Sequence, residues 1–554
     1  MARGSDVFPE ICRKVLVSHL EEALEDLRRH VLWKRDVPIG RPGGLTLIYP
    51  LAYLYSSRFA DNIYFGDRRV LEAAVEVGEF LCACMGPERR DEYRAFADRL
   101  GAVEDWVILF WLDAWELLRP HLPARTLRRW RRAMMPRLTD YAHRVAGYLQ
   151  QERFTSASFN TSPNHAASYA ADLLTAGVVW ARPRWIELAE AFMDRFVAYQ
   201  VEAGYWPEGH GPVCGYQAVS LAAVARFWAL RPKAAYRRAL QRAVDYHQTI
   251  SYPDFTFVAL VDRRQRYRDG VFIWGLGGLT VTPRGRAFVR AALEAALRAP
   301  SQLFWARLLE NYRFLKRGPT PPYTPWTGHR WLENHSCFFR EAGWQYNLSV
   351  NPVVVNPRSP FRLDYQSLLS VWHESVGLIV PGSQDKHRPW HGTFYAPGDD
   401  KLGVLHGGRI GNLCRPRYLE AFYSNGFTGR VEVSLASPRK LALTARQVGR
   451  RHWADVRFNI PLRVGVGATV KVGSASHVLG RKKLALPVPA GAKVTAFDGR
   501  VSIVSSMAGT LHFPCLPWNP YTDNNRSSLR EAFLRLEVPI PAGPGGVRVR
   551  IAVR

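Results

Sequence analysis

The sequence predicts a multidomain α+β protein in which a helical part is followed by an antiparallel sheet part. The chain length and a change in the spacing of apolar residues along the chain support this prediction. A chain of 554 residues exceeds a single hydrophobic core of the usual size, so two or three domains are expected. The composition, 47% hydrophobic and 22% charged, excludes a mostly disordered chain.

Helices are expected from the start of the chain to about residue 316, because apolar residues recur there at helical spacing. About ten helices fit, separated by short loops rich in Gly, Pro and aromatic residues. The clearest segments are "EICRKVLVSHLEEALEDLRRHVL", "RVLEAAVEVGEFLCACM", "WVILFWLDAWELLRPHL", "RWIELAEAFMDRFVAYQ", "AAYRRALQRAVDYHQTI" and "RAFVRAALEAALR". This pattern is typical of helical hairpins wound into a solenoid or a toroid. We therefore assign residues 1–316 to a helical domain.

The stretch "LKRGPTPPYTPWTGHRW" ends the helical pattern with Pro and Gly, and residues 317–331 are predicted to be a linker. Beyond it the spacing of apolar residues changes to two. The alternating segments are "VEVSLAS", "KLALTARQV", "ADVRFNIPL", "ATVKVGS" and "RLEVPIPAGPGGVRVRIAVR". Alternation ended by turn residues predicts strands of an antiparallel sandwich, so residues 332–554 are assigned to a sheet domain.

The chain is strongly basic, with 75 Lys plus Arg against 48 Asp plus Glu and a net charge of +27. Such a charge attracts polyanions, which include nucleic acid, anionic membranes and acidic polysaccharides. The local clusters "RTLRRWRRAMMPR" and "GRKKL" are interpreted as solvated faces. No nucleic-acid motif is recognisable, so an acidic glycan is the expected partner, with neither nucleic acid nor membrane.

Seven cysteines without a paired CxxC motif predict no disulfide framework and no zinc site, and Cys82 and Cys84 are expected to be buried thiols. The first residues, "MARGSDVFPEICRKVL", lack the apolar core of a secretory signal, and no segment is long enough to span a membrane. As written, the sequence predicts a soluble cytoplasmic protein. A secreted or periplasmic protein whose signal has been removed would look the same.

Two polar loops precede predicted helices and carry the residues best suited to chemistry. "FNTSPNHAASYAADLL" delivers Asn164 and His165 to the first turn of a helix, where Ser162 and Pro163 also fit a simple capping role. "EAGYWPEGHGPVCGYQAVSLAAVARFW" places Glu208, His210 and Tyr216 at the start of another helix. Loops of this kind meet at one end of a helical toroid, where sites commonly lie.

Further candidates lie in a basic loop and in the sheet half. "LVDRRQRYRDG" offers several arginines, Arg264 and Arg266 among them, that can grip an acidic substrate as a planar fork. "SVWHESVGLIVPGSQDKHRPWHG" contains His373, which we place in a cleft between the two halves, with His387 and His391 nearby. A metal bound by these histidines is disfavoured, and the expected chemistry requires no cofactor.

The predicted architecture and these motifs resemble the polysaccharide lyases built from an (α/α) toroid and an antiparallel β-sandwich. That group contains chondroitin AC and hyaluronate lyases, heparinase II/III-like proteins and toroidal alginate lyases. The resemblance covers nearly the whole chain as architecture, whereas its motifs are short. The "NH" pair is similar to the alginate-lyase and heparinase-like branch, and "PEGHGP" is similar to the heparinase-like "PEGP" pattern. His210 followed closely by Tyr216 is similar to the chondroitin and hyaluronate branch, but the spacing between the two residues is tighter than in that branch.

The resemblance implies a β-elimination at a 4-linked uronate and assigns the roles. Asn164, with Arg264 or a charged histidine, neutralises the C6 carboxylate. His210, Tyr216 and His373 supply the base and the acid. The substrate-binding residues by the same reasoning are His165, Glu208, Trp206, Arg266 and Tyr53, the last with Tyr55 as a further aromatic candidate.

Two rival functions use the same observations. A toroidal glycoside hydrolase would need two carboxylates, for which Glu208 with Asp61 or Asp172 is the candidate pair. A non-enzymatic protein that binds polyanions would need only the excess of positive charge. Hydrolysis leaves a saturated sugar and elimination an unsaturated one, so the products separate the two enzyme classes.

Overall fold

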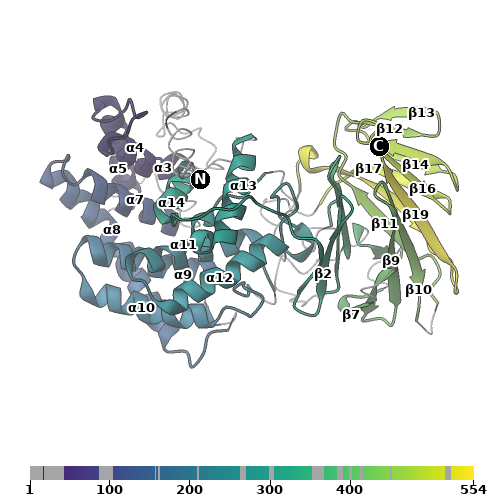
Figure 1. The fold of residues 1–554 in the computed structure, drawn as a ribbon, viewed down its shortest axis with the longest axis horizontal. Helices are drawn as coiled ribbons and strands as arrows, with labels where there is room; N and C mark the ends of the chain where they lie inside the picture. Colours follow the sequence, from purple (N-terminus) through teal and green to yellow (C-terminus); the bar gives the residue numbers. More distant parts are fainter. Residues whose placement is uncertain are drawn as a thin grey trace. The chain divides into compact units, whose positions relative to one another are not determined.

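The computed structural model describes most of the chain (Figure 1). The described residues are 17, 43–85, 104–155, 158–159, 162–208, 211–262, 270–298, 305–351, 367–382, 391–397, 402–411, 416–449, 452–517, 519, 524 and 526–554. The helix predicted over residues 10–32 lies almost wholly outside them.

Two compact units account for the fold. One comprises Met1–Gly209, Gly215–Asp245 and Gly270–Tyr323, and the other comprises His210–Cys214, Tyr246–Asp269 and Thr324–Arg554.

The first unit is helical. Its α-helices are α3 (Gly43–Thr46), α4 (Ile48–Ser56), α5 (Arg68–Met85), α7 (Glu104–Leu118), α8 (Ala124–Leu149), α9 (Pro163–Val179), α10 (Pro183–Ala198), α11 (Cys214–Leu230), α12 (Ala234–Thr249), α13 (Pro283–Arg298) and α14 (Trp305–Phe314), of which α11 and α12 begin or end in the second unit. Short 3₁₀ segments follow α12 at Ala259–Val261 and Leu276–Val281. These bounds confirm the helices predicted for the described residues.

The helices divide into an enclosed set and a covering set. In α7, α9 and α11 the stretches 107–114, 170–177 and 217–227 are buried on every side. In α10, by contrast, the buried residues Ala189, Phe192, Met193, Phe196 and Val197 follow helical spacing and leave the opposite face to solvent. Helices α9 and α10 pack on one another, as do α7 and α9 and α8 and α9. An enclosed layer covered by amphipathic helices is the arrangement of an (α/α) toroid, and the predicted fold class is confirmed.

The second unit consists of three antiparallel sheets. The first has the order β1-β2-β3-β4-β5, the second β13-β12-β15-β16-β19-β10-β9-β8-β7 and the third β14-β17-β18-β11-β6. The strands are β1 (Gly328–Leu332), β2 (Ser336–Glu341), β3 (Trp344–Ser349), β4 (Leu369–His373), β5 (Gly377–Val380), β6 (Phe394–Tyr395), β7 (Leu405–Gly411), β8 (Arg417–Tyr423), β9 (Thr428–Ser437), β10 (Lys440–Gln447), β11 (Arg457–Leu462), β12 (Thr469–Val472), β13 (Ala475–Val478), β14 (Leu484–Val488), β15 (Lys493–Ala496), β16 (Val501–Ser505), β17 (Gly509–Cys515), β18 (Phe533–Pro539) and β19 (Gly546–Val553).

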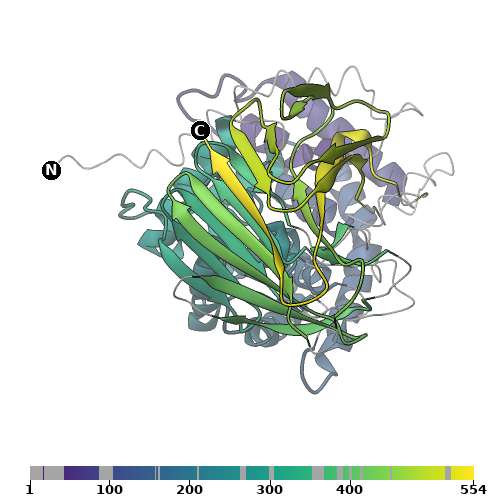
Figure 2. The ribbon, with the colours of Figure 1, turned by 90° about the vertical axis from the view of Figure 1, so that its right-hand side faces the viewer.

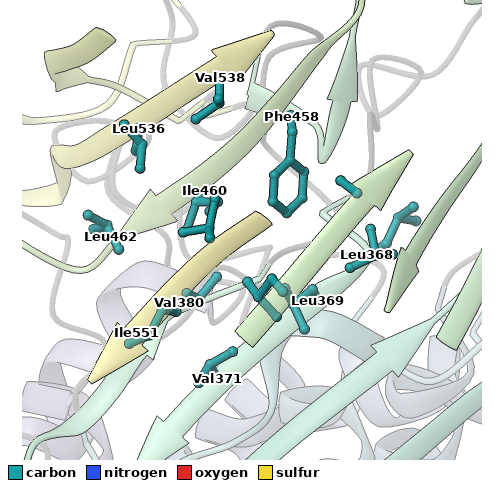
Figure 3. Packing of buried hydrophobic residues seen from close by; sticks show 14 of the residues in the cluster. Leu368, Leu369, Val371, Val380, Phe458, Ile460, Leu462, Leu536, Val538 and Ile551 are labelled. Atoms are coloured by element: carbon teal, nitrogen blue, oxygen red, sulfur yellow. The ribbon is translucent and has the colours of Figure 1, made fainter. Parts of the chain in front are cut away.

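The sandwich core lies between the facing sheets. In β9, buried and partly buried residues alternate over most of the strand, as the sequence predicts for a strand with one solvated face. Figure 3 shows Val371 of β4, Ile460 of β11, Leu536 of β18 and Ile551 of β19 converging on one apolar core. Each of these side chains is at most 1% exposed, and full burial of an aliphatic side chain stabilises by about 1.5–3 kcal/mol.

A segment of the predicted helical domain belongs to the sheet unit. The loop after α12 covers the polar face of the first sheet, where Tyr252 Oη donates to Ser370 Oγ at 2.9 Å. Arg340 donates to the carbonyl of Ser251 at 3.0 Å, and Trp372 Nε1 donates to Asp254 Oδ2 at 3.1 Å. The boundary between the units lies between Tyr323 and Thr324, and β1 begins inside the stretch predicted to be a linker.

Three expectations about composition can be compared with the described residues. The cysteines there, Cys82, Cys84, Cys214, Cys337 and Cys515, are buried and form no disulfide. Groups of His, Cys, Asp and Glu arranged to hold a metal ion are absent from the described parts of the chain. No helix within those parts is both long enough and apolar enough to cross a membrane.

Candidate active site

The loop before α9 places its polar residues where the sequence predicts them. Ser162 occupies the N-cap position with extended backbone, and Pro163 begins the helix. The Ser162 side chain makes no capping hydrogen bond, and its carbonyl accepts from the backbone N–H of His165 at 3.0 Å and of Ala166 at 3.4 Å. Asn164 and His165 therefore project from the positive end of a helix dipole, an environment that favours a negatively charged group.

Asn164 is an unusual polar residue of the helical unit. Its side chain is 1% exposed, and neither the amide nitrogen nor the amide oxygen has a hydrogen-bond partner among the residues that the structure describes. Leaving a buried polar group unpaired costs about 1–3 kcal/mol. Such a cost is expected where the amide is held ready for a ligand.

His165 is paired with an acid from another helix. Its Nδ1 lies 3.0 Å from Asp105 Oδ2, at the start of α7, and Asp105 is 3% exposed. Burial lowers the pKa of His165, but the hydrogen bond to Asp105, its charge and the charge of Glu208 together raise that pKa above the ordinary value. The ring is thereby biased toward the imidazolium form next to the open amide of Asn164.

Asp105→Asn should lower the pKa of His165, because the amide keeps the shape of the side chain but removes its charge. A His165 pKa above the ordinary value of about 6.5 means that the pair stabilises the folded protein fully below that pH and loses this contribution as pH rises through the folded value. NMR titration of the His165 ring in both proteins measures the shift. An unchanged midpoint would contradict the assigned role of Asp105.

Aromatic rings and a buried cation border the same cluster. The ring of Trp106 stacks on His165 with centroids 5.9 Å apart, and meets Trp274 edge to face at 4.5 Å. The guanidinium of Arg307 lies 3.5 Å from the centroid of the Trp274 ring and pairs with Glu310 at 3.0 Å. Burial lowers the pKa of Arg307 to about 10, so this residue is still a cation at neutral pH.

Helix α11 joins the cluster through its second turn. Ala218 and Ala222 pack on Trp274, and Trp106 lies against the same group. Gly275 makes this approach feasible, since its φ is +73° and a Cβ there would lie 2.3 Å from the carbonyl oxygen of Ala218. Tyr216, half-buried, precedes Ala218 by two residues on α11. The structure thus brings the start of the Tyr216 helix to the rings beside His165.

Two residues of the loop before α11 have different surroundings. Glu208 is 4% exposed, and its charge acts on His165. Trp206 is 1% exposed, with its ring stacked on Phe196 and its Nε1 donating to the Phe196 carbonyl at 3.0 Å. Gln217 also bonds both backbone groups of Trp206. Trp206 thus packs in the core, where its faces are not open to a sugar.

His373 lies inside the sheet unit with both ring nitrogens occupied. Nε2 lies 3.1 Å from the carbonyl oxygen of Pro438 and must donate to it, so Nδ1 accepts from the Ser375 hydroxyl at 2.9 Å and from the Ser375 N–H at 3.1 Å. Burial lowers its pKa, and the ring packs edge-on against Trp344. A neutral ring with no open lone pair is suited to holding a turn rather than to removing a proton.

The remaining predicted site residues are not brought to this cluster by any described contact. Tyr53 lies on α4 between the rings of Phe59 and Tyr312, at 6.1 and 6.0 Å. His210, Arg264 and Arg266 lie outside the described residues, as does His387. Their roles stay predictions from the sequence.

The structure adds residues that the sequence analysis missed, namely Asp105, Trp106, Trp274 and Arg307. One local signal was present: an acid and a tryptophan stand immediately before the apolar run of α7, in "EDWVILFW". Polar and aromatic residues at the start of an otherwise enclosed helix point to the open end of that helix. No comparable signal marks Arg307.

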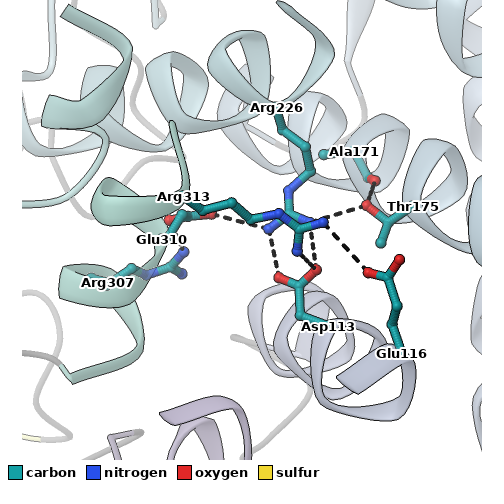
Figure 4. Close-up of polar contacts among 8 residues, drawn as sticks. All are labelled: Asp113, Glu116, Ala171, Thr175, Arg226, Arg307, Glu310 and Arg313. Atoms are coloured by element: carbon teal, nitrogen blue, oxygen red, sulfur yellow. Dashed lines mark hydrogen bonds and ion pairs between the residues drawn. The ribbon is translucent and has the colours of Figure 1, made fainter. Parts of the chain in front are cut away.

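A buried ion network fixes the helices that carry the site (Figure 4). Arg226 of α11 donates twice to Asp113 of α7, at 2.8 Å each, and once to Thr175 of α9 at 3.3 Å. Arg313 of α14 donates to Asp113 at 2.6 Å, and Glu310 lies 3.6 Å from Arg226. The network lies about 12 to 16 Å along α7, α9 and α11 from their site residues, at about 1.5 Å per residue. It holds the site helices together from within.

Comparisons with known proteins give likeness at the level of structure. No protein-family model and no curated protein matches the sequence. The crystal structure of heparinase III is similar over 91% of this chain and 75% of its own, with a TM-score of 0.48 and 12% identity. A heparan sulfate lyase mutant from Pedobacter heparinus is similar over 100% of this chain and 83% of its own, with a TM-score of 0.44 and 13% identity. A GH127 beta-L-arabinofuranosidase from Geobacillus stearothermophilus T6 is similar over 99% of this chain and 95% of its own, with a TM-score of 0.34 and 10% identity. We therefore infer the chemistry of this chain from its own residues.

Proposed function

We propose that this protein is a lyase that cleaves a uronate-containing acidic glycan by β-elimination. The observation that carries the proposal is the buried Asn164 amide, without a hydrogen-bond partner among the described residues, next to a histidine whose pKa is raised by its hydrogen bond to Asp105. An amide donor and a cation at a helix N-terminus form a receptor for a carboxylate. The net charge of +27 agrees with an anionic substrate.

Neutralising the carboxylate is the central requirement of the reaction. The proton alpha to the C6 carboxylate is acidic enough to remove only if the negative charge that develops on the carboxylate oxygens is stabilised. Asn164 would donate to one of these oxygens, and His165 would place its positive charge beside them. Preorganised donors of this kind cost no rearrangement when the charge develops.

The proton transfers are assigned to Tyr216 and His210. A base takes the C5 proton, the electron pair forms the C4–C5 double bond, and the C4–O bond breaks as an acid protonates the leaving oxygen. A tyrosine is a poor base at its ordinary pKa of about 10, but nearby positive charge lowers that value. If Tyr216 performs both transfers the elimination is syn, whereas a base role for His210 with Tyr216 as acid permits an anti elimination.

Hydrolysis is the competing reaction, and the described carboxylates disfavour it. Asp172 is fully buried within α9, and Asp61 is exposed in a turn before α5. Glu208 shares its surroundings with Asp105, because the charges of both residues raise the pKa of His165. Asp105 is already hydrogen-bonded to that ring, so among the described residues Asp61, Asp105 and Asp172 do not form the pair with Glu208 that a hydrolase uses.

Tyr216→Phe should reduce elimination by about 10²- to 10⁴-fold, the usual contribution of a positioned proton-transfer group. The measurement is ultraviolet absorbance over time with alginate, glucuronan, hyaluronan, chondroitin and heparan sulfate, since only elimination yields a conjugated unsaturated uronate. Tyr236→Phe is the matched control, because its hydroxyl donates to Asp194 on the outer helices. New reducing ends without absorbance would replace this proposal by hydrolysis.

A further inference from the structure

One half of the nine-stranded sheet presents a positively charged outer face. Figure 2 shows the strands of this sheet, with β19 in yellow. Along β12, β15, β16, β19 and β10, buried residues alternate with more exposed residues over most of each strand, so that one set faces the core and the other faces outward. The exposed cations on this side are Lys440, Lys471, Lys493, Arg548 and Arg550. We call them the basic face. Their neighbours along each strand, such as Val470, Val549 and Ile551, are buried, which fixes the direction of the cations.

The register of the sheet arranges these cations in rows. In one row, Lys493 pairs with Val504, which pairs with Arg550. In the next, Lys471 pairs with Thr495, and the row continues through Ser502 and Ala552 to Lys440. With strands about 4.8 Å apart, Lys493 and Arg550 are about 10 Å apart and the ends of the second row about 19 Å. The cations are thus spread over an area that an extended polymer would cover.

The other half of the same sheet is electrically balanced. There Arg409 and Arg430 both pair with Glu420, and Glu432 of β9 pairs with Arg446, which lies on β10 at the border of the basic face. On the five strands of the basic face no outward residue is acidic, and its cations form no ion pair with any residue in the described part of the chain. Unbalanced charge raises the self-repulsion of a surface, which an anionic partner relieves.

The side chains between the cations indicate which polyanion fits. Hydroxyl groups from Thr444, Thr469, Thr495 and Ser502 face outward, and no aromatic side chain does so on these five strands. Single-stranded nucleic acids are held largely by bases stacked on aromatic rings, and duplexes by an element that enters a groove. A flat face of cations and hydroxyls offers neither. It suits a polymer of negatively charged, hydroxyl-rich sugars.

We propose that the basic face is a second binding surface for an acidic polysaccharide chain, separate from the Asn164 site. This second proposal takes only the class of ligand, an acidic glycan, from the proposed function. The exposed cluster Arg481–Lys483 follows the edge strand β13 and extends the positive charge at that edge of the sheet. A long substrate bound there would stay associated with the protein between cleavages.

The test is binding of fluorescein-labelled heparin to the full-length chain. The basic-face variant changes Lys440, Lys471, Lys493, Arg548 and Arg550 to Gln, in a Tyr216→Phe background that prevents cleavage of the probe. Each exposed ionic contact contributes little, and five are removed together, so affinity should fall about 5-fold or more. The salt dependence of binding should also become shallower, because fewer counterions are released.

A control variant removes the same charge elsewhere, through Gln at the exposed residues Arg125, Arg128, Arg132, Arg237 and Arg238. Its affinity should change less than about 3-fold. Equal losses in both variants would show that net charge alone attracts the polymer, and no loss in the first variant would reject the basic face. If single-stranded DNA bound as tightly as heparin, and the basic-face substitutions weakened its binding equally, the choice of a glycan would also be rejected. Since binding needs no turnover, this result is independent of whether elimination occurs.

Discussion

Asn164→Ala should lower the kcat of elimination by about 10²- to 10³-fold, the usual cost of removing one preorganised donor from a developing charge. The interaction is expected to strengthen as the uronate carboxylate gains charge in the transition state. The substitution should therefore lower kcat and kcat/KM by similar factors. Asn164→Asp should be more severe, because it places a negative charge where the substrate carboxylate binds.

The stability of the same variant gives a second, independent readout. Asn164 and Asn311 are both 1% exposed, but Asn311 accepts from Gly277 N at 2.8 Å and donates to the Ile273 carbonyl at 2.6 Å. Truncation to alanine leaves a similar cavity at both positions. Asn311→Ala also strands two buried backbone groups, so it should lose about 1–3 kcal/mol more in free energy of unfolding.

These two variants are compared by denaturant unfolding and by steady-state kinetics with the substrate that gives the ultraviolet signal. A kcat unchanged by Asn164→Ala would show that the amide only fills space at the start of α9. Equal stability losses in both variants would mean that Asn164 is bonded as completely as Asn311. A uronate oligosaccharide should also stabilise the parent protein more than Asn164→Ala, because at one ligand concentration the stabilisation rises with the logarithm of the affinity.

The architecture could be predicted from the sequence because its signals are local. Apolar and polar residues that alternate, as in β9, predict a strand wherever they occur. Apolar residues at helical spacing, as in α10, predict a helix in the same way. Asn164 and His165 were found for a related reason, since polar residues at the start of an apolar helix stand out. Such reasoning fails where a segment joins another unit, as the loop carrying Tyr252 and Asp254 does.

The rest of the site could not be predicted because it depends on contacts between distant parts of the chain. Asp105 meets His165 across 60 positions, and neither residue carries a local sign of the other. Burial is equally non-local. Trp206 appears in the sequence as one more aromatic residue in a polar loop, and only packing on Phe196 removes it from the surface.

Arg226→Met should cost about 3 kcal/mol in the free energy of unfolding of the helical unit, because Asp113 loses two of its three hydrogen bonds from cations and keeps only the one from Arg313. Both residues of the Arg226–Asp113 pair are 0% exposed. Arg290→Met provides the matched control, because its pair with Glu294 at 3.0 Å is 44% exposed on each side and an exposed pair contributes at most about 1 kcal/mol. Hydrogen exchange of peptides from α7, α9 and α11 localises the loss. Equal effects of the two substitutions would contradict the role of the network.

The same network predicts how the helical unit responds to acid. Burial raises the pKa of Asp113, but the charges of Arg226 and Arg313 and their hydrogen bonds outweigh burial and hold that pKa below its ordinary value. A depressed folded pKa means that the stabilisation is complete above the unfolded pKa of about 4 and is lost as pH falls through the folded value. Asp113→Asn should therefore flatten the acid limb of a stability–pH curve. Since the network joins the helices that carry Asn164, His165 and Tyr216, the site should lose its geometry over the same pH range in which the parent protein loses this stabilisation.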